Sequence, residues 1–340
     1  MKKIHKKAQI EVSFNWIFVL IAGAAILAFF LMIIRSETNS SKENIDRAVS
    51  GRLDSLLSIL QQNSNAQNIE QVLDVEIEFH CEQDGHTYNV KGGKSRTYLD
   101  SKIIFTPEVL GSAKTMALTK LYSTPYPVVE ILYFTDEKTQ YIFLNDGLAK
   151  EYYNKMPEVI ERKMMSATEL EVLEDAGFRK YIIVVNYDVP ELRNSMKQKS
   201  TIIKLQQIPD NSPFSGKIEF INPLNSSSVP VIRSSINDET LIGAIISGSP
   251  ELYGCTMEKL MQVSRIVGEI NLNRTNLLKN NDVQRCQAFY QIDVPQEYLQ
   301  SIIGNSTYSI DKNYVELQTS TIGLANINRE ISRANCPTIY

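Results

Sequence analysis

The densest group of candidate metal ligands in this chain lies between residues 78 and 86. Glu78, His80, Cys81, Asp84 and His86 supply carboxylate, imidazole and thiolate groups, which are the groups that zinc binds in proteins. Apolar and polar residues alternate through this segment as they do in a half-buried strand, so His80 and Cys81 point to opposite faces. We therefore expect no metal site here, and two histidines on an exposed hairpin face.

A second candidate is the turn Ser247-Gly248-Ser249-Pro250. It follows the apolar run Leu241–Ile246, which predicts a strand, and its backbone amides could bind an anion. The residues that complete a phosphate-binding loop are missing from the sequence around it. The pattern therefore favours a simple turn over an anion site.

No catalytic set emerges from the other side chains. The sequence has no dinucleotide-binding glycine pattern, no nucleophile elbow and no zinc-binding H-E-x-x-H helix. Only His80 and His86 lie outside the N-terminal tail, too few to select a Ser-His-Asp set. The 39 acidic residues offer many carboxylate pairs, but no spacing selects one. We therefore assign no catalytic, cofactor-binding or metal-ligating residue, and we favour a protein that is not an enzyme.

Apolar periodicity over the C-terminal region, residues 255–336, predicts three helices. They cover Cys255–Lys279, Val283–Ile303 and Asp311–Asn335 in an up-down-up arrangement. The third is interrupted by the run Thr319-Ser320-Thr321 and by Gly323. This layout fixes which ends of the helices lie together.

The helix layout limits how the four cysteines pair. Cys255 and Cys286 begin two antiparallel helices, so they lie tens of ångströms apart, at about 1.5 Å of rise per residue. A disulfide needs Cα atoms within about 7 Å. Cys336 ends the third helix beside the start of the second, which predicts a Cys286–Cys336 disulfide. Cys81 and Cys255 stay either free or paired with each other, and four buried thiols are the alternative.

These elements follow one uncharged apolar run, Trp16–Ile34. At about 1.5 Å per residue the run is about 29 Å long, close to the thickness of a bilayer core. Four lysines precede it: Lys2, Lys3, Lys6 and Lys7. Such an excess predicts a cytoplasmic basic tail at residues 1–13, a transmembrane helix at 14–34 and an extracytoplasmic body. A cleaved secretory signal is the alternative, but the run is long and lacks a small-residue cleavage site.

The segment Lys6-Lys7-Ala8-Gln9-Ile10-Glu11-Val12-Ser13-Phe14 directly precedes this run. It resembles the start of archaeal type IV pilin-like proteins, whose prepilin peptidase cuts before the hydrophobic helix. By that resemblance, processing falls between Ala8 and Gln9. The family usually places a glutamate five residues past the cut, whereas here Glu11 is third and Ser13 is fifth. A plain, uncleaved anchor is the alternative.

Composition restricts the class of protein. Hydrophobic residues make up 43% of the chain, which is typical of a globular protein with a core. The net charge of −4 and the lack of a basic stripe exclude a nucleic-acid partner. Four glycosylation sequons, at Asn39, Asn225, Asn273 and Asn305, agree with a surface protein.

Between the anchor and the C-terminal helices we expect an amphipathic stalk helix at residues 41–62 and an ectodomain at 73–250. The stalk carries Ile45, Val49 and Leu53 at helical spacing. The ectodomain strands are predicted at Val75–Cys81, Thr87–Val90, Thr97–Phe105, Val128–Thr135, Tyr141–Asn145, Tyr181–Val185, Thr201–Leu205, Lys217–Ile221, Val229–Arg233 and Leu241–Ile246. Helices are predicted at Glu151–Lys163 and Thr168–Ala176. The first strands make a β-meander, the later ones a mixed α/β layer, and the fold class is α+β or mixed α/β.

Four tyrosines cluster around the start of the α/β layer: Tyr122, Tyr126, Tyr133 and Tyr141. Tyrosine is common at binding surfaces, and it is equally common on half-buried strands. We favour the strand interpretation.

The leading hypothesis is a single-pass surface protein of the cell membrane with an interaction or assembly role, pilin-like by the resemblance. Its partners are the lipid bilayer, through Trp16–Ile34, and a second copy or another surface protein. The alternative is a membrane-tethered hydrolase or a ligand-binding receptor, with a site at the carboxyl ends of the α/β strands. A deep pocket near Ser247–Pro250 lined by carboxylates favours the alternative, and a flat, tyrosine-rich surface favours the interaction role.

Overall fold

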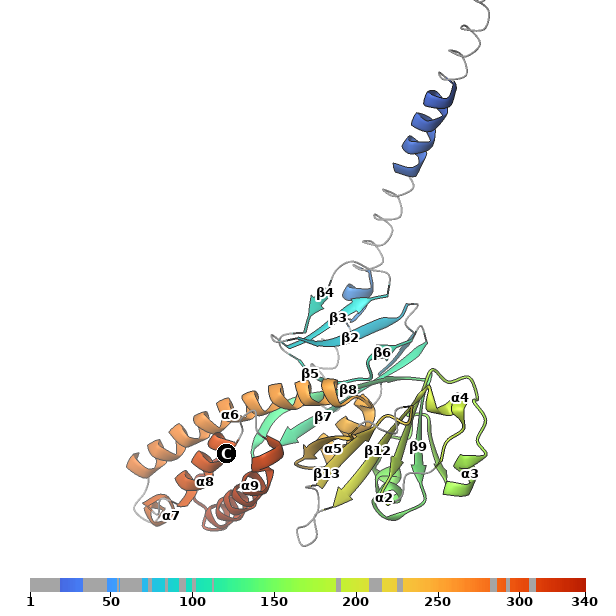
Figure 1. Ribbon diagram of the computed structural model, residues 1–340. Helices are drawn as coiled ribbons and strands as arrows, with labels where there is room; N and C mark the ends of the chain where they lie inside the picture. The colour runs from blue at the N-terminus through green and yellow to red at the C-terminus, as the bar shows by residue number, and fades with distance from the viewer. Residues whose placement is uncertain are drawn as a thin grey trace, which may run out of the picture.

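The computed structural model describes residues 19–32, 48–53, 55, 69–72, 75–82, 85–91, 96–99, 102–111, 113–187, 191–207, 216–224, 229–281, 286–291, 294–305 and 310–340. Within them the chain forms three sheets and a set of helices, which confirms the mixed α/β class (Figure 1). Residues 1–13, including Ala8 and Gln9, lie outside the described residues, as does most of the predicted stalk.

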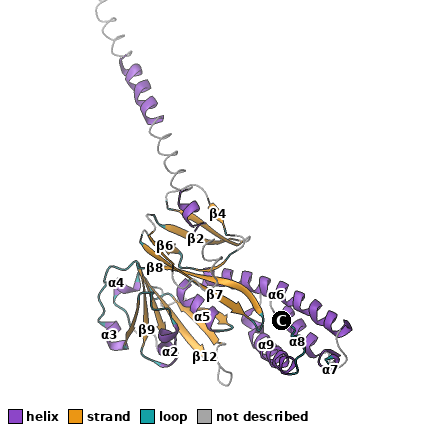
Figure 2. Cartoon of the chain, turned by 180° about the vertical axis from the view of Figure 1, so that it is seen from behind, coloured by secondary structure: helices purple, strands orange, loops and turns teal. Residues whose placement is uncertain are grey.

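The predicted transmembrane helix is described only over residues 19–32, which are helical and almost entirely exposed. No helix among the described residues combines the length and apolar composition that a bilayer crossing requires. The prediction of a span at 14–34 is therefore not supported by this part of the chain. Both views place the helix of residues 19–32 away from the sheets (Figures 1 and 2).

The largest sheet, here called the wide sheet, is mixed. Its strands, in spatial order, are β10 (Arg162–Met165), β9 (Thr139–Leu144), β11 (Lys180–Val185), β12 (Ser200–Gln207), β13 (Gly216–Ile221) and β14 (Val231–Ser235). The first four run parallel, and the last two are antiparallel to their neighbours. The edge strand β10 and the hairpin β13–β14 thus flank a buried parallel centre.

Helices cover both faces of the wide sheet, so its central strand β11 is apolar on both sides, as predicted. Ile182 and Val184 lie in the same core as Tyr152 of α2 (Gly147–Lys155). Ile183 lies in a second core with Leu170 of α3 (Ala167–Glu171). The short helix α4 (Asn194–Lys197) joins that second core. Successive residues therefore enter opposite cores.

Two four-stranded sheets pack against each other beside the wide sheet. The middle sheet has the order β1 (Ile69–Val72), β7 (Lys114–Ser123), β8 (Pro127–Asp136), β5 (Ile103–Phe105). The outer sheet has the order β4 (Arg96–Tyr98), β3 (Gly85–Val90), β2 (Ile77–Glu82), β6 (Val109–Leu110). Phe79 of β2 and Phe134 of β8 share one core between these sheets, and Leu53 from the helical residues 48–53 closes it.

The predicted β-meander is correct for β2, β3 and β4, which are antiparallel. The predicted strand Thr97–Phe105 is wrong as one unit, because β4 belongs to the outer sheet and β5 to the middle sheet. The sequence also missed β1 and β7. Three consecutive residues of β7, Met116 to Leu118, are buried, so β7 lacks the alternation that marks a half-buried strand.

The predicted strand Leu241–Ile246 is wrong, because these residues belong to helix α5 (Asp238–Ser247). The Asn237 side chain accepts the Thr240 backbone N–H and starts the helix as a capping box. The helix packs against strands of both the middle and the wide sheet, so most of its residues are buried. Burial on nearly all sides erases the helical period and leaves a short apolar run that reads as a strand.

The predicted helix Glu151–Lys163 is also wrong in its second half. Helix α2 ends at Lys155, and Pro157 follows within two residues. Residues Arg162–Met165 then form the edge strand β10, paired with β9 on one side only.

Four helices form a helical arm at the C-terminal end of the described chain: α6 (Pro250–Asn281), α7 (Gln287–Gln291), α8 (Val294–Asn305) and α9 (Ile310–Arg333). The predicted second helix, Val283–Ile303, is therefore two helices. Pro295 lies in the first turn of α8, where a helix tolerates a residue without an N–H. Helix α6 runs from the sheets to the far end of the arm (Figure 2).

Two disulfides hold the arm in place, which confirms the expectation of disulfide bonds. Cys286 is joined to Cys336 with 5.7 Å between Cα atoms, and these are the two cysteines that the helix lengths single out. Cys81 of β2 is joined to Cys255 of α6, which ties the outer sheet to the arm. No cysteine is left free.

The double variant Cys286→Ser/Cys336→Ser should unfold more easily than the native chain. Its disulfide closes a loop of 50 residues, and the loss of that restraint on the unfolded chain is worth about 4 kcal/mol. Urea unfolding without reductant measures the difference. An unchanged unfolding midpoint would mean that packing of the arm, not the disulfide, fixes its ends.

Candidate functional site

The parallel strands of the wide sheet reverse their winding between β9 and β11. The connection after β9 leads through α2 to β10, on one side of β9. The connection after β11 leads through α4 to β12, in the opposite direction. Ligands in open α/β sheets bind where two such connections diverge, outside the carboxyl ends of the strands.

The structure has a cleft of about 640 Å³ at this place, here called the switch-point cleft. Its volume lies within the range of small-molecule sites. The lining residues come from the start of α2, the end of β11 and the end of β12: Gly147, Leu148, Glu151, Asn186, Tyr187, Leu205 and Gln206.

The loop before α2 sets the shape of the cleft. Gly147 has a φ of +29°, and a Cβ atom there would lie 2.7 Å from the Asn186 side-chain nitrogen. Only glycine allows the loops after β9 and β11 to approach this closely. The next residue back, Asp146, accepts the Asn186 backbone N–H through Oδ2 at 3.4 Å. Its Oδ1 is buried and has no hydrogen-bond partner among the described residues.

The far end of α2 is fixed to α5. The Tyr152 hydroxyl donates to Asp238 Oδ1 at 2.5 Å, and the Lys155 ammonium donates to both oxygens of the same carboxylate at 3.0 Å. The wall of the cleft that α2 supplies is therefore held from behind, and a ligand would meet a preformed surface.

The charges around the cleft are negative. Of its lining residues, Glu151 carries the formal charge, and its carboxylate lies 2.7 Å from the Lys155 ammonium one turn further along α2. Asp146 adds a second carboxylate beside Gly147. The lining described here includes neither lysine nor arginine.

The predicted turn Ser247–Pro250 joins α5 to α6. Gly248 adopts the left-handed conformation that ends α5, and its amide donates to the Ala244 carbonyl at 3.0 Å. That amide is therefore not available to an anion. Two hollows adjoin the turn. One, beside Ser247 and Gly248, is about 130 Å³, below the size of most ligand sites. The other, beside Ser249, is about 360 Å³ and is also lined by Glu78, Glu108 and Glu251, so it is a carboxylate-lined hollow of the kind that the alternative function predicts at this turn.

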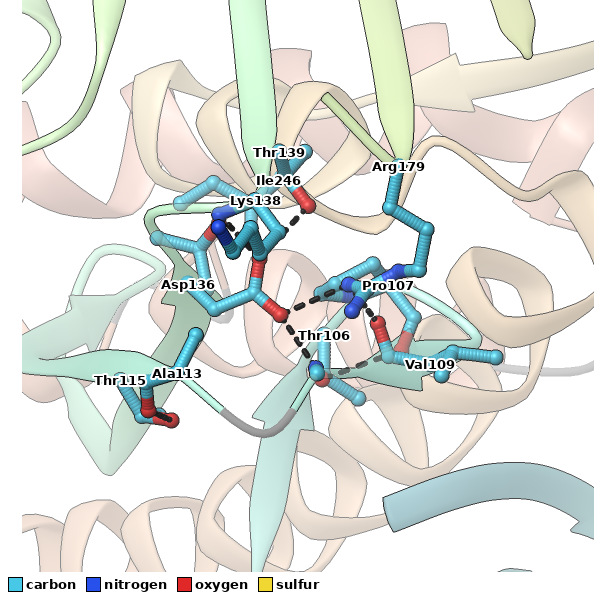
Figure 3. A network of polar contacts seen from close by, with 12 residues as sticks. Thr106, Pro107, Val109, Ala113, Thr115, Asp136, Lys138, Thr139, Arg179 and Ile246 are labelled. Atoms are coloured by element: carbon cyan, nitrogen blue, oxygen red, sulfur yellow. Dashed lines mark hydrogen bonds and ion pairs between the residues drawn. The ribbon is translucent and has the colours of Figure 1, made fainter. Parts of the chain in front are cut away.

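Beside the smaller hollow, an ion pair between the fully buried Asp136 and the part-buried Arg179 joins the three sheets (Figure 3). Asp136, at the end of β8, is fully buried, and its Oδ2 accepts from Arg179 at 2.7 Å and from the Gly111 amide at 2.5 Å. Its Oδ1 accepts from the Lys138 amide and the Thr139 hydroxyl, each at 3.0 Å. Arg179 also donates to the Val109 carbonyl. Every lone pair is used, so the pair is structural and not a reaction centre.

The hairpin that offered metal ligands has other roles. Cys81 is committed to its disulfide, and His80 bonds to the Asn89 side chain at 2.6 Å. The expectation that both histidines are exposed is wrong for His86, which is 2% exposed and lies 3.2 Å from the Thr256 hydroxyl. No group of three or more histidine, cysteine or acidic side chains within the described residues is arranged to hold a metal.

The four clustered tyrosines are core residues. Tyr122, Tyr126 and Tyr141 are 0% exposed, and Tyr133 is 4% exposed. Tyr122, Tyr133 and Tyr141 lie on strands, as the favoured interpretation has it, but they are buried on all sides and not half-buried, and Tyr126 lies in the turn between β7 and β8. These four do not form a tyrosine-rich surface. The residues that line the cleft were missed from the sequence, although Asp146-Gly147 and Asn186-Tyr187 directly follow two apolar runs predicted as strands.

Comparison with protein-family models, with curated proteins and with solved structures finds no match to this chain.

Replacing Asp136 by asparagine should destabilise the fold by about 1–3 kcal/mol, because an amide NH2 takes the place of a buried oxygen that accepts hydrogen bonds and leaves their donors unpaired. Urea unfolding gives the free energy. The matched control is Glu269→Gln, since the Arg265–Glu269 pair has side chains 55% and 50% exposed. It should change stability by less than about 0.5 kcal/mol. Equal losses in the two variants would remove the special role of Asp136.

The stability of the fold should fall as the pH drops from about 6.5 to about 4. Burial, helped by the charge of Lys259, lowers the pKa of His86 from 6.5 to about 4. In this window the unfolded chain binds a proton that the folded chain does not, which costs up to about 3 kcal/mol at the acid end. Unfolding measured against pH should show the loss, His86→Gln should reduce it, and His80→Gln should retain it. A His86→Gln profile that matches the native one would contradict this assignment.

Proposed function

We propose that this chain is a membrane-anchored surface protein with an interaction role, and that it binds a small ligand in the switch-point cleft. The observation that carries the proposal is the coincidence of the cleft with the point where the connections after β9 and β11 diverge. A fold alone does not define a function, but a site of this kind at this place does support one.

The anchor and the location rest on separate support. The run Trp16–Ile34 is uncharged and follows a lysine-rich tail, which favours an N-terminus in the cytoplasm. Both disulfides lie in the body, at Cys81–Cys255 and Cys286–Cys336. Disulfides persist outside the reducing cytoplasm. The two arguments favour the same topology independently.

The second candidate function is assembly into a filament, as the resemblance at Lys6–Phe14 implies. One structural observation favours it. Val49 and Leu53, from the helical residues 48–53, are 7% and 1% exposed in the core of the outer sheet. A helix that follows the apolar run therefore packs on the body, which agrees with the stalk of a pilin-like subunit.

A topology and mass experiment tests the anchor. Sealed right-side-out membrane vesicles that contain the native chain are treated with a membrane-impermeant protease. The body should be digested, and the N-terminal tail should be protected. A protected body would overturn the proposed location. The intact mass of the extracted chain decides between the two functions, because a start at Met1 or Lys2 means an anchor and a start at Gln9 means pilin-type processing.

A further inference from the structure

We propose that the switch-point cleft binds a neutral, hydroxyl-rich ligand of the saccharide class. This inference rests on the proposed binding function and names the chemistry of its ligand. Four properties of the cleft carry it: the sign of its charges, its position at the start of a helix, its hydrogen-bonding groups and one exposed ring.

The charges disfavour an anionic ligand. Glu151 lines the cleft and Asp146 lies beside it, while the lining that the structure describes includes no cationic side chain. A phosphate or carboxylate group would meet two like charges. Sites that recognise such groups supply arginine or lysine instead.

The position disfavours a cationic ligand. Gly147 begins α2, and the start of a helix carries a partial positive charge from its free backbone N–H groups. A cation would need a carboxylate in the lining, and the one there, on Glu151, already lies 2.7 Å from the Lys155 ammonium, whereas Asp146 lies beside the cleft and is not among its lining residues. An amine or metal ion would therefore gain little in the cleft. A neutral ligand remains as the favoured class.

The lining offers hydrogen bonds of both kinds. Asn186 has an amide that both donates and accepts, and Tyr187 has a hydroxyl that does the same. Gln206 donates its amide N–H to Glu219 at 2.5 Å, which orients the group and leaves its oxygen to accept from a ligand. A sugar hydroxyl also donates and accepts, so a row of hydroxyls matches these groups.

Tyr187 supplies an apolar surface among them. Its side chain is 62% exposed although it lines the cleft, and its hydroxyl lies 3.3 Å from the position a Cβ on Gly147 would take. Tyrosine offers a rigid ring face at low entropic cost. One face of a pyranose ring consists of C–H groups and packs on such a ring, while its hydroxyls reach the polar side chains at the rim.

Binding of saccharides to the full, detergent-extracted chain tests the proposal. A glycan array of neutral oligosaccharides identifies the preferred sugar, and calorimetry with the free disaccharide gives its affinity. Tyr187→Ala should weaken binding about ten-fold, from the loss of ring contact, and Asn186→Ala should weaken it several-fold. Tyr187→Phe should retain most of the affinity if the ring face carries the contact. If the chain binds the polymer immobilised on the array but not the free disaccharide, the ligand of the cleft is a surface glycan.

Two matched controls lie outside the cleft. Val172 is also 62% exposed, beyond the end of α3, and Asn222 is exposed after β13. Val172→Ala and Asn222→Ala should bind as the native chain does. Equal weakening in the controls would overturn the assignment to the cleft. Retention of both disulfides in each variant, mapped by mass spectrometry, shows that the fold is intact.

The remaining outcomes separate this inference from the binding function on which it rests. A parallel screen uses cationic amines and phosphorylated compounds. If one of these binds, loses affinity in Tyr187→Ala and no neutral sugar binds, the saccharide class is wrong and the cleft is still a binding site. If no probe of any class binds the folded chain, both proposals fail.

Discussion

The three sheets meet at one buried carboxylate. Asp136 ends a strand of the middle sheet, and it receives hydrogen bonds from Gly111 beside the outer sheet, from Thr139 in the wide sheet and from Arg179 directly before its strand β11. A buried charge is tolerated only where each of its oxygens is satisfied. The relative position of the sheets is therefore tied to the geometry of a single group, and the sheets cannot slide without leaving that charge unpaired.

Helices α5 and α6 extend this joint into the arm. Helix α5 is wedged between the middle and wide sheets, and Tyr253 of α6 stacks on Phe105 with 5.9 Å between ring centroids. Gly243 allows α5 to pack this closely, since a Cβ at this position would lie 2.6 Å from the Phe105 ring. These contacts also hold the cleft rigid, because α2, which forms one of its walls, is hydrogen-bonded to Asp238 at the start of α5. A surface site is thus supported from the core.

Local patterns identified the elements whose burial is simple. The β-branched run Tyr181–Val185 was visible in the sequence because that strand is buried on both faces, and the alternation in β2 was visible because that strand is buried mainly on one face. Helix α5 and strand β7 could not be recognised from the sequence, because burial from several directions removes the regular spacing of apolar residues. The cleft residues follow two predicted strands, but strand order decides whether these strands are neighbours. That order arises from long-range pairing, which no local pattern records.

The disulfides also determine how the chain would carry mechanical load. A pull between the N-terminal side and the C-terminal tail passes from Cys81 to Cys255 and from Cys286 to Cys336 through covalent bonds. Residues 82–254 and 287–335 form loops outside that line. The wide sheet and its cleft lie in the first loop, so tension along the chain would reach α6 without stretching the strands that shape the cleft.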